Sequence, residues 1–276
     1  MTKVAATMRP TGDRIASMFD AARARGEAVL VTYLMAGDPD LATSKAAALA
    51  CAEGGADLLE IGMPFSDPIA DGPTIQRAGE RALAGGTTVA DALAVAAHVR
   101  ARSDVRLALM GYLNPLLSYG LERFFPDAAR AGVDAVILPD VPPEEAGPVR
   151  RAADPAGVKV VGLLAPTSTE ARRRAVAEAA TGFLYFVSVT GVTGARRALP
   201  EDLAARVAEV RASSSLPVVV GFGVATAQQA HQVAGLADGV VVGSALVARL
   251  AEPGSRKVRV ERVRRFVRSL ERAMKR

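Results

Sequence analysis

Eight short apolar segments alternate with helical stretches rich in Ala, Arg and Glu, and this alternation limits the fold more than any other feature of the chain. The apolar segments begin at Ala28, Ala56, Val105, Asp134, Val158, Phe183, Leu216 and Asp238. Strands that are apolar throughout and separated by helices indicate a parallel sheet covered on both faces. Closed barrels of eight such units take about 250 residues, so 276 residues favour this architecture over an open doubly wound sheet. We therefore expect a single (β/α)8 barrel domain, a TIM barrel, over residues 1–276.

Two further helices are predicted outside the eight units. Residues 13–25 form an extra N-terminal helix that we expect to plug the N-terminal end of the barrel. Residues 256–276 hold ten Lys or Arg and two Glu, a net charge of +8 that leaves −3 for the rest of the chain out of a total of +5. Apolar side chains recur there every three or four positions, at Val260, Val263, Val267, Leu270 and Met274. This spacing predicts a basic amphipathic C-terminal helix docked on the barrel.

The basic charge is therefore local. No aromatic residues are interleaved with a basic patch, so a nucleic-acid partner is not expected. No apolar run reaches the ~20 residues needed to cross a bilayer, and the first residues lack the apolar core of a signal peptide. The single cysteine, Cys51, lies in an apolar helical stretch and is interpreted as a buried packing residue. These features predict a cytoplasmic protein that does not associate with membranes.

Residues 58–76, LLEIGMPFSDPIADGPTIQ, carry the strongest functional signal. The apolar run ends in Glu60, and a buried strand accommodates a carboxylate only where it faces an open end. Asp71 follows eleven positions later in a proline-rich loop that can fold back over the strand end. Two carboxylates that face one pocket are typical of general acid–base chemistry.

Glycines follow the last three predicted strands, in the segments TGVTGA, GFGVAT and GSA. Backbone amides approach a phosphate closely only where no side chain intrudes, and a helix N-terminus adds favourable partial charge. Barrels often hold a phosphate at this position. Tight turns explain one such segment alone, but three together favour a phosphate site. Aromatic and aliphatic residues at strand ends, Tyr33, Tyr112, Leu138, Tyr185 and Phe222, predict a flat apolar slot between the carboxylates and the phosphate.

The residues that other reaction classes require are not found at suitable positions in the sequence. A Schiff-base aldolase needs a lysine in the pocket, but Lys159 begins a strand, Lys45 lies in a helix and the other three lysines lie near the termini. The two histidines, His98 and His231, lie in separate helical stretches, so neither a metal site nor a serine nucleophile with a base is expected. No GxGxxG follows a strand, so a dinucleotide cofactor is not indicated.

Seven segments of the chain closely resemble the tryptophan synthase α chain. They include TYLMAGDPD, PFSDPIADGPTIQ, LMGYLNPLLSYGLERF, YFVSVTGVTGAR and GVVVGSALV. The resemblance implies a (β/α)8 barrel that cleaves indole-3-glycerol phosphate to indole and glyceraldehyde 3-phosphate in a retro-aldol step of L-tryptophan biosynthesis. It also implies no cofactor in this chain, and a partner β chain that holds pyridoxal phosphate in an α2β2 complex.

Site residues carried over from the resemblance fall on matching positions. The catalytic pair is Glu60 and Asp71. Thr193 matches the loop threonine that orients the aspartate, and the phosphate binders fall on Gly194, Gly223, Gly243 and Ser244. Residues that line the substrate site are Tyr33, Tyr112, Tyr185 and Phe222, with Tyr33 standing where the family more often has Phe. The resemblance places the β chain over the catalytic end. We expect its docking surface to include Pro64, Phe65, Pro68, Pro115 and Leu116, because apolar residues in these loops would be costly to expose without a partner.

Two alternatives remain at this point. One is another phosphate-binding barrel, either a sugar-phosphate isomerase of histidine synthesis or an indole-glycerol-phosphate synthase. The first is expected to show a duplicated half-barrel and the second to carry lysines at strand ends, and we find neither. The other alternative is a non-catalytic module that activates a β chain. Both Glu60 and Asp71 are present, which argues against it.

Overall fold

The computed structural model describes residues 12–187, 199–221 and 223–275, and these form a closed barrel of parallel strands. The strands are β1 Val29–Met35, β2 Leu58–Gly62, β3 Arg106–Met110, β4 Ala135–Ile137, β5 Lys159–Leu164, β6 Leu184–Val187, β7 Val218–Gly221 and β8 Gly239–Val242. They follow one another around the barrel in chain order, and β8 closes it by pairing with β1. All eight predicted strands, the barrel and the rejection of an open sheet are confirmed.

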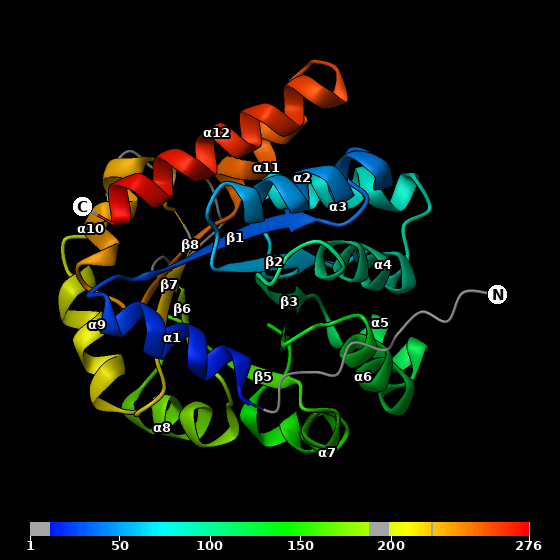
Figure 1. Cartoon of the computed structure of the whole chain (residues 1–276). Helices are drawn as coiled ribbons and strands as arrows, with labels where there is room; N and C mark the ends of the chain where they lie inside the picture. Colours follow the sequence, from blue (N-terminus) through cyan, green and yellow to red (C-terminus); the bar gives the residue numbers. More distant parts are fainter. Residues whose placement is uncertain (1–11, 188–198, 222, 276) are drawn as a thin grey trace.

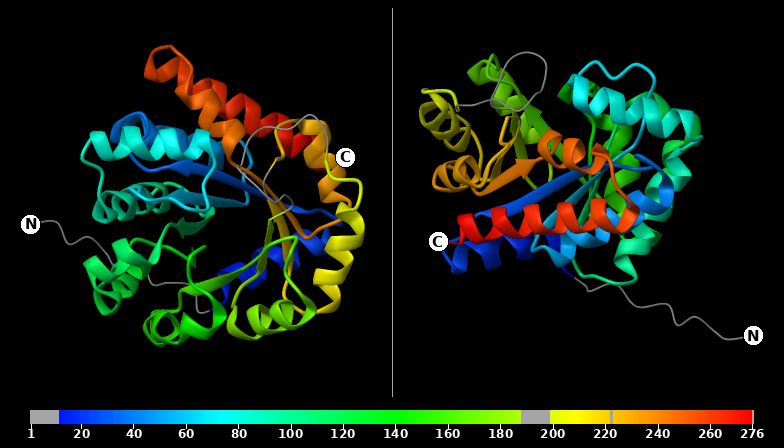
Figure 2. Two further views of the ribbon diagram at one scale, coloured as in Figure 1. Left: turned by 180° about the vertical axis from the view of Figure 1, so that it is seen from behind. Right: turned by 90° about the horizontal axis from the view of Figure 1, so that it is seen from above.

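The helices surround the strands (Figures 1 and 2). They are α1 Arg14–Ala24, α2 Leu41–Glu53, α3 Pro73–Ala84, α4 Val89–Arg100, α5 Leu113–Tyr119, α6 Leu121–Arg130, α7 Ala146–Ala156, α8 Glu170–Ala179, α9 Leu203–Ala212, α10 Ala227–Ala234, α11 Ser244–Ala251 and α12 Arg256–Met274, with a 3-10 turn, η1, at Pro143–Glu145. Both extra helices, α1 and α12, lie where the sequence predicts them.

Side chains alternate along each strand between two cores. On β1, Leu30 and Leu34 pack outward against the helices, whereas Val31 and Tyr33 pack inside the barrel. The inner core is closed at the N-terminal end of the barrel by α1, whose Phe19 ring lies 5.7 Å from that of Phe183. Glu60 occupies an inward position in β2, so the alternation of the strand directs its carboxylate into the barrel.

A repeated hydrogen bond fastens neighbouring strands at the N-terminal end. The side chains of Asp57, Asp134, Thr181 and Asp238, each just before an even-numbered strand, accept from a backbone N–H at or next to the start of the preceding strand, at 2.8 to 2.9 Å. Asp134 also accepts from Arg14 at 3.0 Å and from Arg100 at 2.8 Å. Its carboxylate is 6% exposed, so three donors satisfy a charge that burial would otherwise make costly.

The basic helix α12 lies across the outside of the barrel, against α2, α10 and α11 (Figure 1). Val263, Val267 and Leu270 are fully buried, as the apolar spacing predicts. Several arginines have structural roles. Arg259 donates to Leu250 O at 3.0 Å, and Arg262 donates to Arg249 O at 3.0 Å. Both bonds satisfy carbonyls near the C-terminal end of α11, where a positive charge is also favourable.

Across the described ranges, no single helix combines the length and apolar composition of a membrane span; α3 and α4 reach them only as a pair bent by 102°.

Candidate active site

Glu60 lies at the bottom of the barrel mouth, opposite Tyr33 of β1 and Ala108 of β3. It is 0% exposed, and neither of its carboxylate oxygens has a hydrogen-bond partner in the part of the chain that the structure describes. Burial without a partner disfavours the charged form and raises the pKa of Glu60 to about 8. The carboxyl can therefore both hold and release a proton near neutral pH, which general acid–base catalysis requires.

Asp71 lies on the loop of residues 63–72 between β2 and α3. Its backbone N–H donates to Pro68 O at 3.2 Å, and the Gln76 side chain donates to the Asp71 carbonyl at 2.9 Å. Burial raises the pKa of Asp71 to about 6, although a hydrogen bond from the Tyr112 hydroxyl opposes this rise. The loop thus brings a second carboxylate to the mouth with a pKa below that of Glu60.

Two buried tyrosines, Tyr33 and Tyr185, share the barrel interior with these carboxylates. Burial, and the charges of both Glu60 and Asp71, raise the pKa of each phenol. Glycines provide the space for their hydroxyls. A Cβ at Gly62 would stand 2.1 Å from the Tyr33 hydroxyl, and one at Gly221 would stand 2.5 Å from that of Tyr185. Each of these tyrosines therefore lies near enough to both Glu60 and Asp71 to interact with their charges.

The described part of the predicted phosphate site lies after β7 and β8. Gly223 has φ +98°, a conformation that favours glycine. Gly243 caps the N-terminus of α11 without a side-chain hydrogen bond, and Ser244 is the first helical residue. By contrast, Thr226 and Gln229 cap α10 with their own side chains. Gly243 also faces Tyr33, where a Cβ would stand 3.3 Å from the tyrosine Cβ. Thr193, Gly194 and Phe222 lie outside the described residues.

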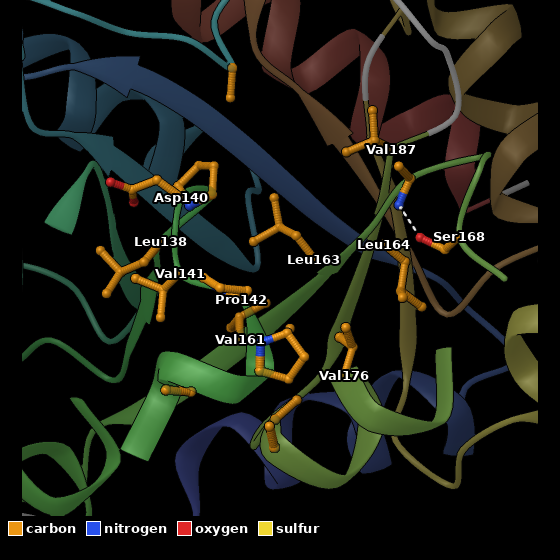
Figure 3. Close-up of a pocket in the computed structure, with 18 of the residues that line it drawn as sticks. Leu138, Asp140, Val141, Pro142, Val161, Leu163, Leu164, Ser168, Val176 and Val187 are labelled. Carbon is orange, nitrogen blue, oxygen red and sulfur yellow. Dashed lines mark hydrogen bonds between the residues drawn. The ribbon is translucent and has the colours of Figure 1, made fainter. Parts of the chain in front are cut away.

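A cavity of about 880 Å³ opens at this end of the barrel and extends over β4 and β5 (Figure 3). Asp71 lines it, whereas Glu60, Tyr33 and Tyr185 are not part of its wall. The sequence reading found Leu138 but missed the apolar wall residues Met110, Val161, Leu163 and Val187. All four lie in strands, and the inward positions of those strands could have identified them once the register was known.

The alternatives excluded from the sequence remain without support in the structure. Lys159 pairs with Asp13 at 2.7 Å, at the N-terminal end of the barrel and away from the mouth. His98 and His231 lie in α4 and α10, as expected. Among the described residues, no group of three or more His, Cys, Asp or Glu is arranged to hold a metal ion. Cys51 is fully buried, as predicted.

The predicted docking surface needs a correction. Leu116 is 0% exposed and Pro64 is also buried, so neither side chain is available to a partner. Sequence position alone could not show which face of α5 packs on the barrel. Of the described residues in the loop of residues 63–72 and in α5, the large hydrophobic side chains that are exposed are Ile69, at 84%, and Leu117, at 52%.

The fold is a closed parallel barrel whose mouth holds one buried carboxyl, Glu60, and one partly exposed carboxyl, Asp71, both of raised pKa, beside a helix end that no side chain caps. This combination is typical of barrel enzymes that use acid–base chemistry. The family model of the tryptophan synthase alpha chain matches residues 19–275, and the chain belongs to this family.

Known relatives agree with the family model. A tryptophan synthase alpha chain from Citrifermentans bemidjiense is 55% identical over 234 residues, which is 85% of this chain and 88% of the relative. The corresponding chain from Geotalea uraniireducens is 50% identical over 262 residues, with 95% and 98% covered. A solved structure of Mycobacterium tuberculosis tryptophan synthase superimposes with a TM-score of 0.89 at 41% identity, covering 96% of this chain and 99% of the other. The alpha chain from Legionella pneumophila gives 0.87 at 36% identity, with 96% and 98% covered.

The function follows from the family. The chain is a lyase that cleaves indole-3-glycerol phosphate in tryptophan biosynthesis. It needs no cofactor of its own, because pyridoxal phosphate belongs to the β chain. Its similarity to chains of whole tryptophan synthase structures suggests a β-chain partner.

Proposed function

We propose that Glu60 and Asp71 carry out the retro-aldol cleavage in this chain, with Glu60 as the proton donor and acceptor and Asp71 as the anion beside the indole nitrogen. The observation that carries this proposal is the difference between the surroundings of the Glu60 carboxyl and those of the Asp71 carboxyl. Glu60 has no hydrogen-bond partner among the described residues and its pKa is raised to about 8, whereas Asp71 has a pKa of about 6. At neutral pH one carboxyl holds a proton while the other is ionised.

The chemistry then balances. Protonated Glu60 delivers its proton to indole C3, which leaves positive charge on the ring and its N–H. The Asp71 carboxylate accepts the hydrogen bond of that N–H and offsets the charge. The Glu60 carboxylate then takes the proton of the glycerol hydroxyl next to the scissile carbon–carbon bond. That bond breaks, the hydroxyl carbon becomes the aldehyde of glyceraldehyde 3-phosphate, and Glu60 has regained its proton.

The phosphate and the ring take the remaining positions. The amides around Gly223, Gly243 and Ser244 would hold the phosphate, with Thr193 and Gly194 contributing from residues outside the described ranges. The uncapped start of α11 supports this placement. Tyr33, Tyr112, Tyr185 and Phe222 would border the indole.

The assembly and its location are also part of the proposal. A β chain would cover the catalytic end in an α2β2 complex, contacting Ile69 and Leu117, two large apolar residues that are exposed there. The complex would be cytoplasmic.

The direct test is to incubate the pure chain with indole-3-glycerol phosphate, alone and with a β chain, and to measure indole. Asp71 must be ionised and Glu60 protonated, so kcat/KM should fall below about pH 6 and above about pH 8. A rate that rises steadily through pH 9 would assign Glu60 a different protonation state and contradict its role as the initial acid.

A further inference from the structure

Three residues of the loop that carries Asp71 contact one side chain, that of Tyr112. The Ala70 N–H donates to the Tyr112 hydroxyl at 3.0 Å. The same hydroxyl lies close enough to the Asp71 carboxylate to lower the pKa of Asp71, and the carboxylate in turn raises the pKa of the Tyr112 phenol. At the start of the loop, the Phe65 ring lies against the Tyr112 ring with 5.3 Å between centroids. A single phenol therefore holds the loop backbone at Ala70 and lies beside the carboxylate of the next residue, Asp71.

The rest of this loop has few ties to the barrel. Its other hydrogen bonds run mostly within the loop, where the Ile69 N–H donates to Asp67 O and the Asp71 N–H donates to Pro68 O. Ile69 is 84% exposed. The Gln76 bond to the Asp71 carbonyl fixes the backbone but leaves the carboxylate free to rotate. Among the described residues, the Tyr112 hydroxyl is the group that lowers the pKa of the Asp71 carboxyl, so it is the neighbour that can set the direction of the carboxylate.

Tyr112 is in turn held firmly. It is 4% exposed and directly follows the end of β3, where Gly111 N donates to Ile137 O at 3.1 Å. The next residue, Leu113, donates its N–H to the Asp140 carboxylate at 3.0 to 3.1 Å. Preorganised side chains of this kind hold a reacting group in its productive geometry.

We propose that Tyr112 is the positioning residue for Asp71: its hydroxyl, which accepts from Ala70 and donates to the carboxylate, orients Asp71 toward the indole nitrogen. This extends the sequence prediction, which made Tyr112 only a wall of the indole slot, and it rests on the proposed role of Asp71.

Tyr112→Phe tests the proposal because it keeps the ring and its contact with Phe65 and removes only the hydroxyl. Hydrogen bonds to charged groups contribute enough to predict a fall in kcat of about 10- to 100-fold. KM should change little, because the indole surface is preserved. Tyr119→Phe is the matched control: it removes a hydroxyl that donates to a carboxylate, Asp127, at 2.7 Å, at the far end of the same helix. It should leave kcat unchanged.

A double-mutant cycle decides whether Tyr112 acts through Asp71. In an Asp71→Asn background, Tyr112→Phe should cost much less than it does in the wild type. Two losses that simply multiply would overturn the proposal. A raised KM with an unchanged kcat would also overturn it, because Tyr112 would then only line the slot.

A second readout does not depend on cleavage. Asp71 can be followed by carboxyl-carbon NMR titration, with its signal assigned from Asp71→Asn. Besides Tyr112, the phenols that interact with Asp71 are Tyr33 on β1 and Tyr185 on β6, and the Glu60 carboxyl on β2 acts on both of these phenols. None of these changes in Tyr112→Phe, so loss of the hydroxyl should move the Asp71 midpoint to higher pH, and Tyr119→Phe should not move it.

The two proposals can fail separately. If the wild type releases no indole but the Asp71 midpoint still moves in Tyr112→Phe, the proposed catalytic role is wrong and the positioning contact stands. If the wild type releases indole normally and the Asp71 midpoint does not move in Tyr112→Phe, the proposed contact between Tyr112 and Asp71 is wrong. Phe65→Leu, at a partly exposed position, is a second variant should Tyr112→Phe fold poorly, and it should move the midpoint in the same direction by a smaller amount.

Discussion

At the N-terminal end of the barrel, the buried Asp134 carboxylate accepts hydrogen bonds from Arg14, Arg100 and a backbone amide, whereas at the C-terminal end both oxygens of Glu60 lack a partner in the described chain. Both carboxylates lie on the same sheet and are at most 6% exposed. Because Asp134 is paired, it links neighbouring strands. Because Glu60 is unpaired, its carboxyl can bind a proton near neutral pH. The difference teaches that one end of this barrel is built for stability and the other for chemistry.

The largest effect should come from removing the unpaired acid. Glu60→Gln keeps the shape of the side chain but cannot transfer a proton, so cleavage should fall by at least ~10²- to 10⁴-fold. The rate of indole release under saturating substrate measures this fall. The affinity of the protein for the phosphate group should change little. A variant within threefold of the wild type would contradict the assignment.

The same substitution should also change how the stability of the protein depends on pH. Because burial raises the pKa of Glu60 from 4.5 to about 8, the native state prefers the protonated form. The stability that this preference provides is full below about pH 4.5 and is lost as the pH rises through 8. Urea unfolding of the wild type should therefore show stability falling over this interval, and Glu60→Gln should lack that part of the pH dependence.

At the other end, Asp134→Ala should unfold the protein more easily without changing the chemistry. Removing one member of a buried charge network costs about 3 to 5 kcal/mol, because Arg14 and Arg100 lose their partner. Denaturant unfolding measures the loss. Asp154→Ala is the control, since it breaks an exposed pair with Arg150 and should cost under about 1 kcal/mol. A large loss of kcat in folded Asp134→Ala would show that the two ends are not separate.

Asp71→Asn should reduce kcat by ~10²- to 10³-fold, because a neutral amide cannot offset charge at the indole nitrogen. The fold should be retained, since Asp71 lies on a surface loop. Thermal unfolding beside the kinetic measurement separates the outcomes: an active but unstable variant would make Asp71 a structural residue like Asp134.

The barrel, α1 and α12 could be predicted because hydrophobic period and strand count depend on local sequence. Glu60 and Asp71 could be predicted as candidates because a charge inside an apolar strand, followed by a second one in a proline-rich loop, is conspicuous in the sequence. The ties at Asp57, Asp134, Thr181 and Asp238 were missed, although the three aspartates each precede an apolar run, because their partners lie 20 to 27 residues away. The face of α5 was also beyond sequence reasoning. Leu116 and Leu117 are adjacent and equally apolar, and only packing makes one buried and the other exposed.

A smaller effect is expected at the phosphate site. Gly243→Ala adds one methyl group where the amides of α11 would meet the phosphate, and its Cβ would also stand 3.3 Å from Tyr33. Gly243 has φ −113°, so alanine meets no backbone strain there, whereas Gly223 at φ +98° would confound the test. Binding of glyceraldehyde 3-phosphate should weaken more than binding of free indole. Equal weakening of both ligands would place Gly243 outside the phosphate site.

The smallest change in cleavage rate should come from the proposed docking surface at the C-terminal end of the barrel. Leu117 is 52% exposed on α5, and Leu117→Asp should lower the activation by a β chain while leaving the basal rate of the isolated chain unchanged. Val258→Asp is the matched control, because Val258 is 48% exposed on α12, which packs on α2, α10 and α11 on a different side of the barrel from α5. Indole release with and without the β chain gives both rates for each variant. If Val258→Asp lost as much activation as Leu117→Asp, the partner would lie over the outer helices, and the separation of the barrel into a stable end and a working end would no longer predict where it binds.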